Sequence, residues 1–349
     1  MEIRSLEHGE REALLELLDG WEAPSGWRGR AADFFRRYVE DDPSFADENV
    51  WLAVEGGRLL SCVQIFPRRL RLHGAEVPTG GIGSVFSRPE TRGAGLAARL
   101  LERARTAMQE REMELTLLFA GPAGIPLYTR LGWRSWPGTR LLLRWSGAPA
   151  APVPGVALGA LDAARDLPAV AALHAAYSAG RDGTVVRDAE AWRASLRLAG
   201  NPEEEFRVAR RGGSVVAYAR GVSLAGFLVL SELGRGGDER DAEALAALVA
   251  ESLTPREADV LAPPERGSAA FRALAVAAPL DDSALEQALA RLGIASSVLP
   301  DETPMLSCLD ASALARRLGE ALAPGEGSDT FLRRMLPPAR FRFWLADRF

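Results

Sequence analysis

The spacing of apolar and polar positions divides the first 150 residues into helices and strands of ordinary length. Residues 9–19 and 29–40 have apolar side chains at helical spacing. The runs VWLAV (50–54) and LLSCVQIFPRRLRL (59–72) predict strands, joined by a Gly-Gly hairpin turn. The other elements expected here are a strand over 80–87, a helix over 94–112, a strand over 113–120, a short helix over 125–132 and a last strand over 139–145. This order predicts a mixed α/β sheet.

The same layout returns in weaker form after SGAPAAPVPG (146–155), whose Pro, Ala and Gly content is typical of a linker. FRVARRGGSVVAYARGV (206–222) repeats the strand, Gly-Gly turn and strand of residues 50–66. A third strand over 226–234 and a helix over 242–253 follow, so the pattern predicts an internal duplication. The expected units are 1–145, the linker 146–155, a second copy over 156–300 and a C-terminal segment over 301–349.

Composition narrows the classes of protein. The chain has 349 residues and a net charge of -5, which argues mildly against a nucleic-acid binder, since such proteins usually present a basic face. Cys62 and Cys308 lie in unrelated contexts, so we expect neither a metal site nor a disulfide framework. No apolar run reaches the roughly 18 residues of a membrane span, and the chain opens on charged residues. We therefore expect a cytoplasmic protein with no membrane partner.

The loop between the strand 80–87 and the following helix has the properties of an anion site. The first N–H groups of a helix have no intrahelical partner and lie at the positive end of the helix dipole. Small side chains let an anion reach these groups, and an arginine adds positive charge. The residues that combine these properties are Arg92, Gly93, Ala94, Gly95, Leu96 and Ala97.

Three kinds of phosphate loop are possible here. A Walker A loop requires lysine, and the chain contains none. The dinucleotide pattern G-x-G-x-x-G/A matches weakly at Gly93, Gly95 and Ala98, but five residues separate the strand from the first glycine. The third pattern, Q/R-x-x-G-x-G/A, fits from Arg92 to Ala97. It resembles the acetyl-CoA loop of the GNAT superfamily of N-acetyltransferases, whose order of elements is also the order predicted above.

A second motif, LYTRLGW (127–133), is similar to the F/Y-Y-x-R/K-x-G-F/W segment of that superfamily. The resemblance implies that Tyr128 is the general acid. When the acetyl group leaves CoA, the sulfur departs as a thiolate, and a phenol within hydrogen-bond reach can protonate it. The alternative is a core tyrosine with a satisfied hydroxyl.

The resemblance also assigns a role to the strand before the loop. In this superfamily the strand diverges from its neighbour and leaves its main-chain groups free to pair with pantetheine. The residues concerned would be Val85, Phe86 and Ser87, with one N–H polarising the thioester carbonyl. Residues up to Ser84 are expected to remain in an ordinary sheet ladder.

The second copy differs at the corresponding loop. Asp238, Glu239 and Asp241 crowd its helix start, where carboxylates suit the helix dipole but repel a pyrophosphate. This copy is expected to have lost CoA binding and to serve as scaffold or substrate wall. A tandem GNAT pair with a degenerate second copy resembles the enhanced intracellular survival (Eis-like) family, which implies a C-terminal sterol-carrier-like piece, here truncated.

The candidate general bases and acceptor-binding residues come from the C-terminus, two further acids and the first helix pair. The Eis-like resemblance implies that the terminal carboxylate, here on Phe349, lies in the active site; the alternative is that FRFWLADRF (341–349) forms a closing edge strand. Glu90 and Glu114 are expected to be solvated. The first two predicted helices usually cover the acceptor in this superfamily. The residues expected to meet it are Trp27, Asp33 and Phe34, with Trp21 and Phe35 beside them; the alternative is that the aromatic residues belong to the core.

These observations together predict an acetyl-CoA-dependent N-acetyltransferase without a metal. It would transfer the acetyl group to a primary amine of a small molecule or peptide by direct attack in a ternary complex. The alternative is a non-catalytic acyl-CoA-binding or scaffold protein. A homo-oligomer is possible under either function.

Overall fold

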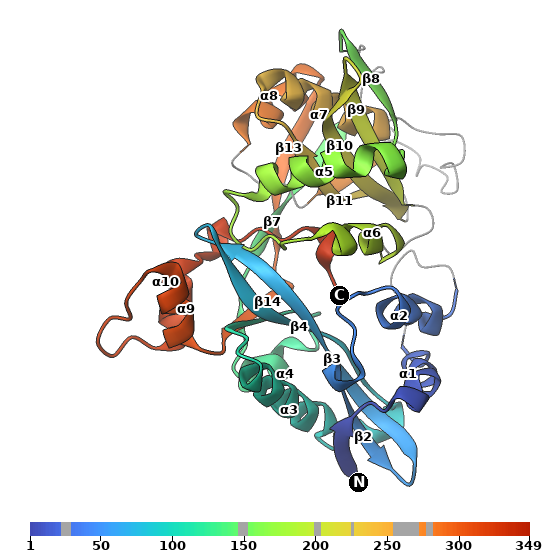
Figure 1. The fold of residues 1–349 in the computed structure, drawn as a ribbon, viewed down its shortest axis with the longest axis vertical. Coiled ribbons are helices and arrows are strands. Elements are labelled where there is room, and N and C mark those ends of the chain that lie inside the picture. Colours follow the sequence, from blue (N-terminus) through green and yellow to red (C-terminus); the bar gives the residue numbers. More distant parts are fainter. Residues whose placement is uncertain (22–28, 146–152, 199–203, 225–226, 254–271, 277–281) are drawn as a thin grey trace, which may run out of the picture.

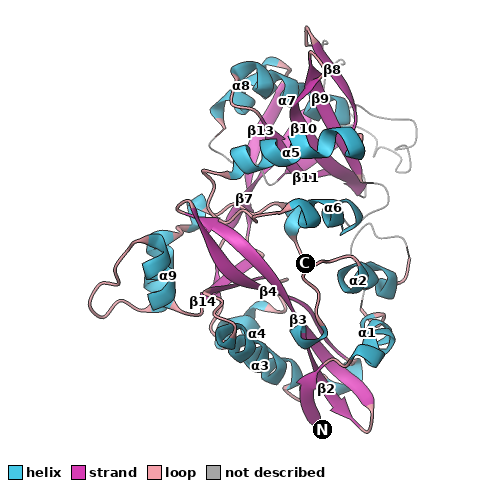
Figure 2. Ribbon diagram, in the orientation of Figure 1, coloured by secondary structure: helices cyan, strands magenta, loops and turns pink. Residues whose placement is uncertain are grey.

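The structure is a computed structural model that describes residues 1–21, 29–145, 153–198, 204–224, 227–253, 272–276 and 282–349. These residues form two seven-stranded mixed sheets, one in each half of the elongated molecule (Figures 1 and 2). Helices cover both faces of each sheet. Within the described residues no helix is both long and apolar enough to cross a membrane.

The first sheet has the order β1-β2-β3-β4-β5-β14-β6. Its pairs are antiparallel except for β4 and β5, which run parallel. The turn between β2 and β3 places Gly56 and Gly57 at positive φ, as the sequence predicted. The strands are β1 (Glu2–Ser5), β2 (Val50–Glu55), β3 (Arg58–Leu72), β4 (Ala75–Ser87), β5 (Leu115–Phe119), β14 (Pro304–Cys308) and β6 (Arg134–Ser135).

Both faces of the first sheet are covered by helices, which explains the continuous apolar run of β2. Trp51 and Ala53 of β2 pack with α3 (Leu96–Glu110) on one face. Leu52 and Val54 face the opposite way, toward α1 (Arg11–Leu18) and α2 (Ala31–Glu40). The short helix α4 (Ile125–Arg130) joins the α3 side through Leu127 and Tyr128.

The second sheet repeats this plan in the order β8-β9-β10-β11-β12-β7-β13, with β11 and β12 parallel. Helices α7 and α8 pack on the face of Ala217 and Ala219, while α5 and α6 pack on the face of Tyr218. The strands are β8 (Val156–Ala160), β9 (Glu205–Arg211), β10 (Ser214–Leu224), β11 (Phe227–Arg235), β12 (Arg272–Val276), β7 (Gly138–Trp145) and β13 (Ile294–Asp301). The helices are α5 (Ala163–Ser178), α6 (Ala189–Leu198), α7 (Glu239–Leu253) and α8 (Ser283–Arg291).

Sheet membership crosses the unit boundaries expected from the sequence. Strand β7, predicted to end the first sheet, instead pairs with β12 and β13 in the second. Strand β14, from the other half of the chain, takes the equivalent place between β5 and β6. Each half thus gives one strand to the other sheet. Alternating apolar residues specify that a strand is buried, but they do not specify which of two similar sheets accepts it.

The C-terminal segment completes the first half of the molecule. Its helices α9 (Ala311–Leu318) and α10 (Ser328–Met335) pack with β14 on the same hydrophobic cluster as Leu70 of β3 and Leu117 of β5. Residues 341–349 then form extended chain with one short 3₁₀ turn, so the closing strand considered above is wrong. The kinship of this segment to sterol-carrier-like domains stays a prediction.

Candidate functional site

The site begins where β4 separates from β5. The parallel ladder between these strands ends at the pair Ile82 and Leu118. On its other edge β4 continues to pair with β3 as far as Ser87 opposite Ser61. Over residues 83–87, the edge of β4 that faces β5 therefore has no strand partner among the described residues. The expected ladder ends before Ser84 rather than after it.

A bulge accounts for the divergence. Ser84 has φ of 49°, a left-handed conformation that is uncommon for a residue with a Cβ, and the β3–β4 register shifts at this point. The Ser84 hydroxyl donates to Gln64 Oε1 at 3.1 Å, and the Cys62 thiol donates to the Ser84 carbonyl at 3.2 Å. These contacts hold the bulge in place and bend the strand end away from β5.

The three strand residues predicted to meet pantetheine follow the bulge. Val85 packs toward α3, whereas the ring of Phe86 is buried on the α1–α2 side and stacks on Trp21, with centroids 5.8 Å apart. The Ser61 hydroxyl lies 2.7 Å from both the Phe86 carbonyl and the Ser87 hydroxyl. The β3 side of this strand is thus fixed, which leaves its β5 side open to a ligand.

The loop after β4 has the form of an anion cradle. Gly93 and Gly95 have φ of 84° and 75°, which other residues rarely adopt, and their main-chain N–H groups donate to no acceptor among the described residues. Gly95 is the N-cap of α3, whose first turn contains no acidic residue. The side chain of Arg92 is exposed beside it. Backbone donors, a helix dipole and a cation therefore converge where the sequence placed them.

Tyr128 lies on α4, a helix that begins six residues after the end of β5, on the carboxyl side of that strand. Its ring meets Trp133 edge to face at 6.2 Å. The hydroxyl makes no hydrogen bond within the described part of the chain, which distinguishes it from a satisfied core tyrosine. Burial raises its pKa to about 12, so the phenol keeps its proton at neutral pH.

The C-terminus lies against β4 close to the divergence. A Cβ on Gly83 would be 3.2 Å from the carbonyl carbon and oxygen of Phe349, and a Cβ on Gly81 would overlap the Phe349 ring. This ring also stacks on Phe66 at 5.1 Å. The sequence of glycines in β4 thus provides the space that the last residue occupies.

The proposed acceptor residues are only partly brought to this place. Trp27 lies outside the described residues. Asp33 is exposed in the first turn of α2, and Phe34 is half-buried beneath Arg37 and beside Phe35. Among the aromatic residues proposed for the acceptor, it is instead Trp21 that stacks on Phe86 of β4.

Comparison with known proteins decides the family of the first half. Residues 2–135 match the profile of the family described as an acetyltransferase (GNAT) domain. They belong to the GNAT acetyltransferases. A domain of this family makes the protein an acetyl-CoA-dependent acyltransferase. No curated protein sequence matches the chain.

Solved structures share the fold over most of the chain. The GCN5-related N-acetyltransferase of Kribbella flavida matches 89% of this chain and 72% of its own, with 22% identity and a TM-score of 0.62. The corresponding protein of Anabaena variabilis matches 88% and 73%, with 14% identity and a TM-score of 0.64. Eis1 from Mycobacterium abscessus matches 90% and 75%, with 20% identity and a TM-score of 0.57. At these identities the likeness concerns the fold, and it supports an Eis-like tandem GNAT architecture.

The equivalent helix start in the second GNAT-like copy is occupied by its own carboxylates. Asp238 accepts the N–H of Arg240 at 3.0 Å. Asp241 forms an ion pair with Arg211 at 2.8 Å, and one of its oxygens fills the space beside Gly236. These contacts support the prediction that this copy does not bind CoA.

The structure differs from the sequence-based expectation for one of two acids, and it adds a cavity that the sequence did not indicate. Glu114 was expected to be solvated, but it is buried and pairs with Arg317 at 2.6 Å; Glu90 is exposed and pairs with Arg58. A cavity of about 350 Å³ opens beside the C-terminal tail, between the two halves, and is lined in part by Arg68, Arg187 and Asp347. Arg187 and Asp347 lie in no recognisable motif, so only the fold could have identified them.

Replacing Gly83 with alanine is expected to displace Phe349, because the new Cβ would also lie 2.9 Å from the Phe66 ring. Overpacking of this kind costs about 1–3 kcal/mol of unfolding free energy, measured by denaturant titration. Gly180→Ala is the matched control, since nothing lies within 4 Å of its Cβ position. Equal stability of the two variants would contradict this placement of the terminus.

Proposed function

We propose that the GNAT domain transfers an acetyl group from acetyl-CoA to a primary amine of a small molecule or peptide, by direct attack in a ternary complex. Three observations carry the proposal: β4 has a free edge where it separates from β5, the C-terminus lies beside Gly83 of this strand, and the phenol of Tyr128 on α4 has no hydrogen-bond partner among the described residues. Acetyl-CoA supplies the activated acetyl group. The residues of this chain orient the thioester and move protons.

In this proposal the loop 92–97 binds the pyrophosphate and the edge of residues 85–87 binds the pantetheine arm. A main-chain N–H on this edge polarises the acetyl carbonyl, a contribution of about 3 kcal/mol when such a donor is well placed. Tyr128 protonates the departing sulfur. The carboxylate of Phe349 accepts a proton or a hydrogen bond from the incoming ammonium, since a terminal carboxyl is ionised at neutral pH.

The acceptor is proposed to approach from the face of the first sheet that α1 and α2 cover. On this face Trp21 stacks on Phe86 of β4, and the C-terminus lies against the same strand. The cavity of about 350 Å³ on this side matches the lower range of small-molecule sites. Free, buried Cys62 and Cys308 are compatible with the reducing cytoplasm. A homo-oligomer remains part of the proposal without support from a particular contact.

A thiol-release assay over a panel of primary amines tests the activity. CoA release that depends on one class of amine, with the acetylated product seen by mass spectrometry, is the expected result. Tight CoA binding without release on any amine would contradict the proposal and favour an acyl-CoA-binding scaffold.

Arg92→Glu is expected to weaken CoA binding by about tenfold or more in calorimetry, because it replaces a cation by an anion beside the proposed pyrophosphate site. Asp238→Arg, the matched change at the second copy, should leave one site per chain with unchanged affinity. A second site in that variant, or unchanged binding by Arg92→Glu, would contradict the assignment of the loop.

A further inference from the structure

We propose that Arg187 is a positioning residue for the reaction: it joins Glu232 of the second sheet to Asp347 of the C-terminal tail and thereby fixes the carboxylate of Phe349 against β4. This inference rests on the proposed function, in which that carboxylate takes part in catalysis. It also gives a role to the second GNAT-like copy, whose loop at the equivalent helix start is occupied by its own carboxylates.

The tail (residues 341–349) passes between the two halves of the molecule, and Figure 1 shows the C-terminus beside α2 and α6. Its aromatic side chains pack in cores of both halves. Phe341 and Phe343 pack in the cluster of α9 and α10, whereas Trp344 packs in the core of the second sheet and stacks on Tyr177. Both halves of the molecule thus hold the tail before it reaches β4.

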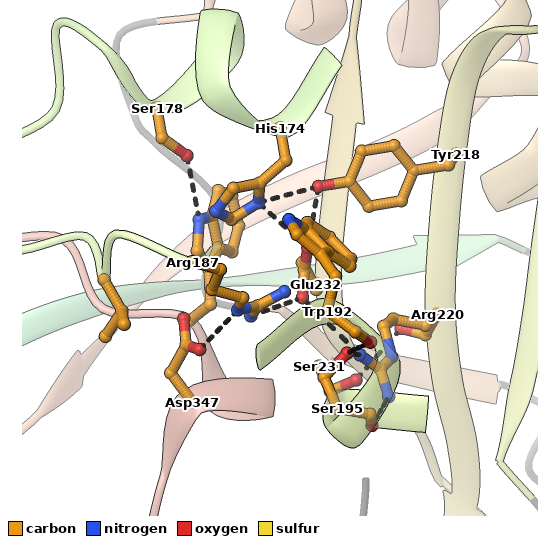
Figure 3. Close-up of polar contacts among 12 residues, drawn as sticks. His174, Ser178, Arg187, Trp192, Ser195, Tyr218, Arg220, Ser231, Glu232 and Asp347 are labelled. Carbon is orange, nitrogen blue, oxygen red and sulfur yellow. Dashed lines mark hydrogen bonds and ion pairs between the residues drawn. The ribbon is translucent and has the colours of Figure 1, made fainter. Parts of the chain in front are cut away.

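Arg187 makes a buried polar link between the tail and the second sheet (Figure 3). Its Nε donates to Asp347 Oδ1 at 2.7 Å, and its Nη2 donates to Glu232 Oε2 at 2.7 Å. The three side chains are almost fully buried, with exposed fractions of 3%, 7% and 0%. One guanidinium therefore bridges two carboxylates that belong to segments 115 residues apart in sequence, from 232 to 347.

Glu232 is itself fixed by further partners. The Tyr218 hydroxyl donates to its Oε1 at 2.7 Å, and His174 Nδ1 lies 3.0 Å away. Burial alone would raise the pKa of Glu232, but the charge of Arg187 and the contact with His174 outweigh it and hold that pKa well below its usual range. The arginine likewise has its pKa raised by the two carboxylates against the effect of burial. Both shifts favour the charged forms of Glu232 and Arg187 that make this bridge.

The energetics favour a role in geometry. A buried ion pair contributes little net stability compared with apolar side chains of similar size, because desolvation offsets the attraction. It does impose fixed directions and distances on the groups that it joins. Asp347 is two residues before Phe349, so a displacement of Asp347 would also displace the terminal carboxylate. A misplacement of about 1 Å can cost roughly 10²-fold in rate.

The last residues are held from other sides as well. Arg348 Nη2 donates to Asp301 Oδ2 at 2.9 Å and to Thr303 Oγ1 at 2.8 Å. The Tyr38 hydroxyl approaches the Arg348 carbonyl at 3.5 Å. Asp301 ends β13 of the second sheet and Tyr38 belongs to α2 of the first half, so these contacts hold Arg348 at the junction of the two halves, whereas Arg187 fixes the preceding residue.

The test compares Asp347→Asn with Asp166→Asn. Asp166 is a matched control because it is also buried in the second half and is bonded to two arginines, at 2.8 Å and 2.5 Å, away from the tail. At saturating amine, Asp347→Asn should lower kcat about 10–100-fold while the KM for acetyl-CoA stays unchanged. Asp166→Asn should keep the wild-type kcat, even if both variants unfold at lower temperature.

A second measurement follows the terminus independently of catalysis. Carboxypeptidase should release Phe349 from native Asp347→Asn at least about tenfold faster than from the wild type or Asp166→Asn, since cleavage follows the population of released tail. Unchanged release would overturn the proposal, and so would faster release without a loss of kcat. Equal kcat losses in both variants would show a merely structural role.

The two proposals fail in different ways. A wild-type chain that acetylates no amine contradicts the proposed function. Unchanged release of Phe349 from Asp347→Asn contradicts the anchoring through Arg187 whether or not an amine is acetylated.

Discussion

Tyr128→Phe is expected to lower kcat by about 10²–10⁴-fold, because the thiolate of CoA would leave without the proton of a positioned acid. CoA affinity and the midpoint of thermal unfolding should hardly change. The hydroxyl makes no hydrogen bond within the described residues, so its removal leaves no buried group without a partner. Steady-state kinetics, calorimetry and a melting curve check the three parts. A full rate in Tyr128→Phe would assign the residue to the core instead.

The pH profile gives a second view of the same group. Burial raises the pKa of Tyr128 to about 12, and the active form is the protonated phenol. The contribution of this acid is therefore present at every lower pH and is lost only as the pH rises toward that pKa. We expect no basic limb of kcat between pH 7 and 9. A basic limb in that range that disappears in Tyr128→Phe would contradict the shifted pKa.

Adding two glycines after Phe349 is expected to lower kcat about 10²-fold or more, because the carboxylate moves several ångströms while all packing of the tail is kept. CoA binding should be unaffected. The Phe349 ring would remain stacked on Phe66, so a stability change is not expected to explain the loss. Rates are measured with the amine that the panel identifies.

Phe349→Leu is the control for this extension. It leaves the carboxylate in place and removes only part of the ring packing, so most activity should be retained. If the extended chain acetylates at the wild-type rate, the terminal carboxylate has no part in catalysis and the tail serves only to join the two halves.

The sequence predicted the local features of the catalytic half well. Periodicity located α3 and β3 to within two residues at each end, and the Gly-Gly turn between β2 and β3 was correct. The loop from Arg92 to Ala97 could be proposed as a phosphate site without the fold, because the residues on which the proposal rests are consecutive. The family assignment of residues 2–135 confirms the resemblance on which the acetyl-CoA prediction rested.

Expectations about distant segments were less successful. The pattern of β7 correctly indicated a strand but placed it in the wrong sheet. Glu114 was expected in solvent because its partner Arg317 is about 200 residues away in sequence and no local pattern announces the pair. The aromatic residues of the tail suggested a strand, although their burial comes from packing in two separate cores.

By itself, then, the sequence determined the order of elements, the duplication, the anion cradle and the candidacy of Tyr128, because each depends on contacts between residues close in the chain. Only the tertiary structure decided the exchange of β7 and β14, the place of Phe349 beside Gly83 and the link from Glu232 through Arg187 to Asp347. These features join segments separated by a hundred residues or more. Their partners are selected by burial, charge and available space in the folded molecule, none of which a local pattern encodes.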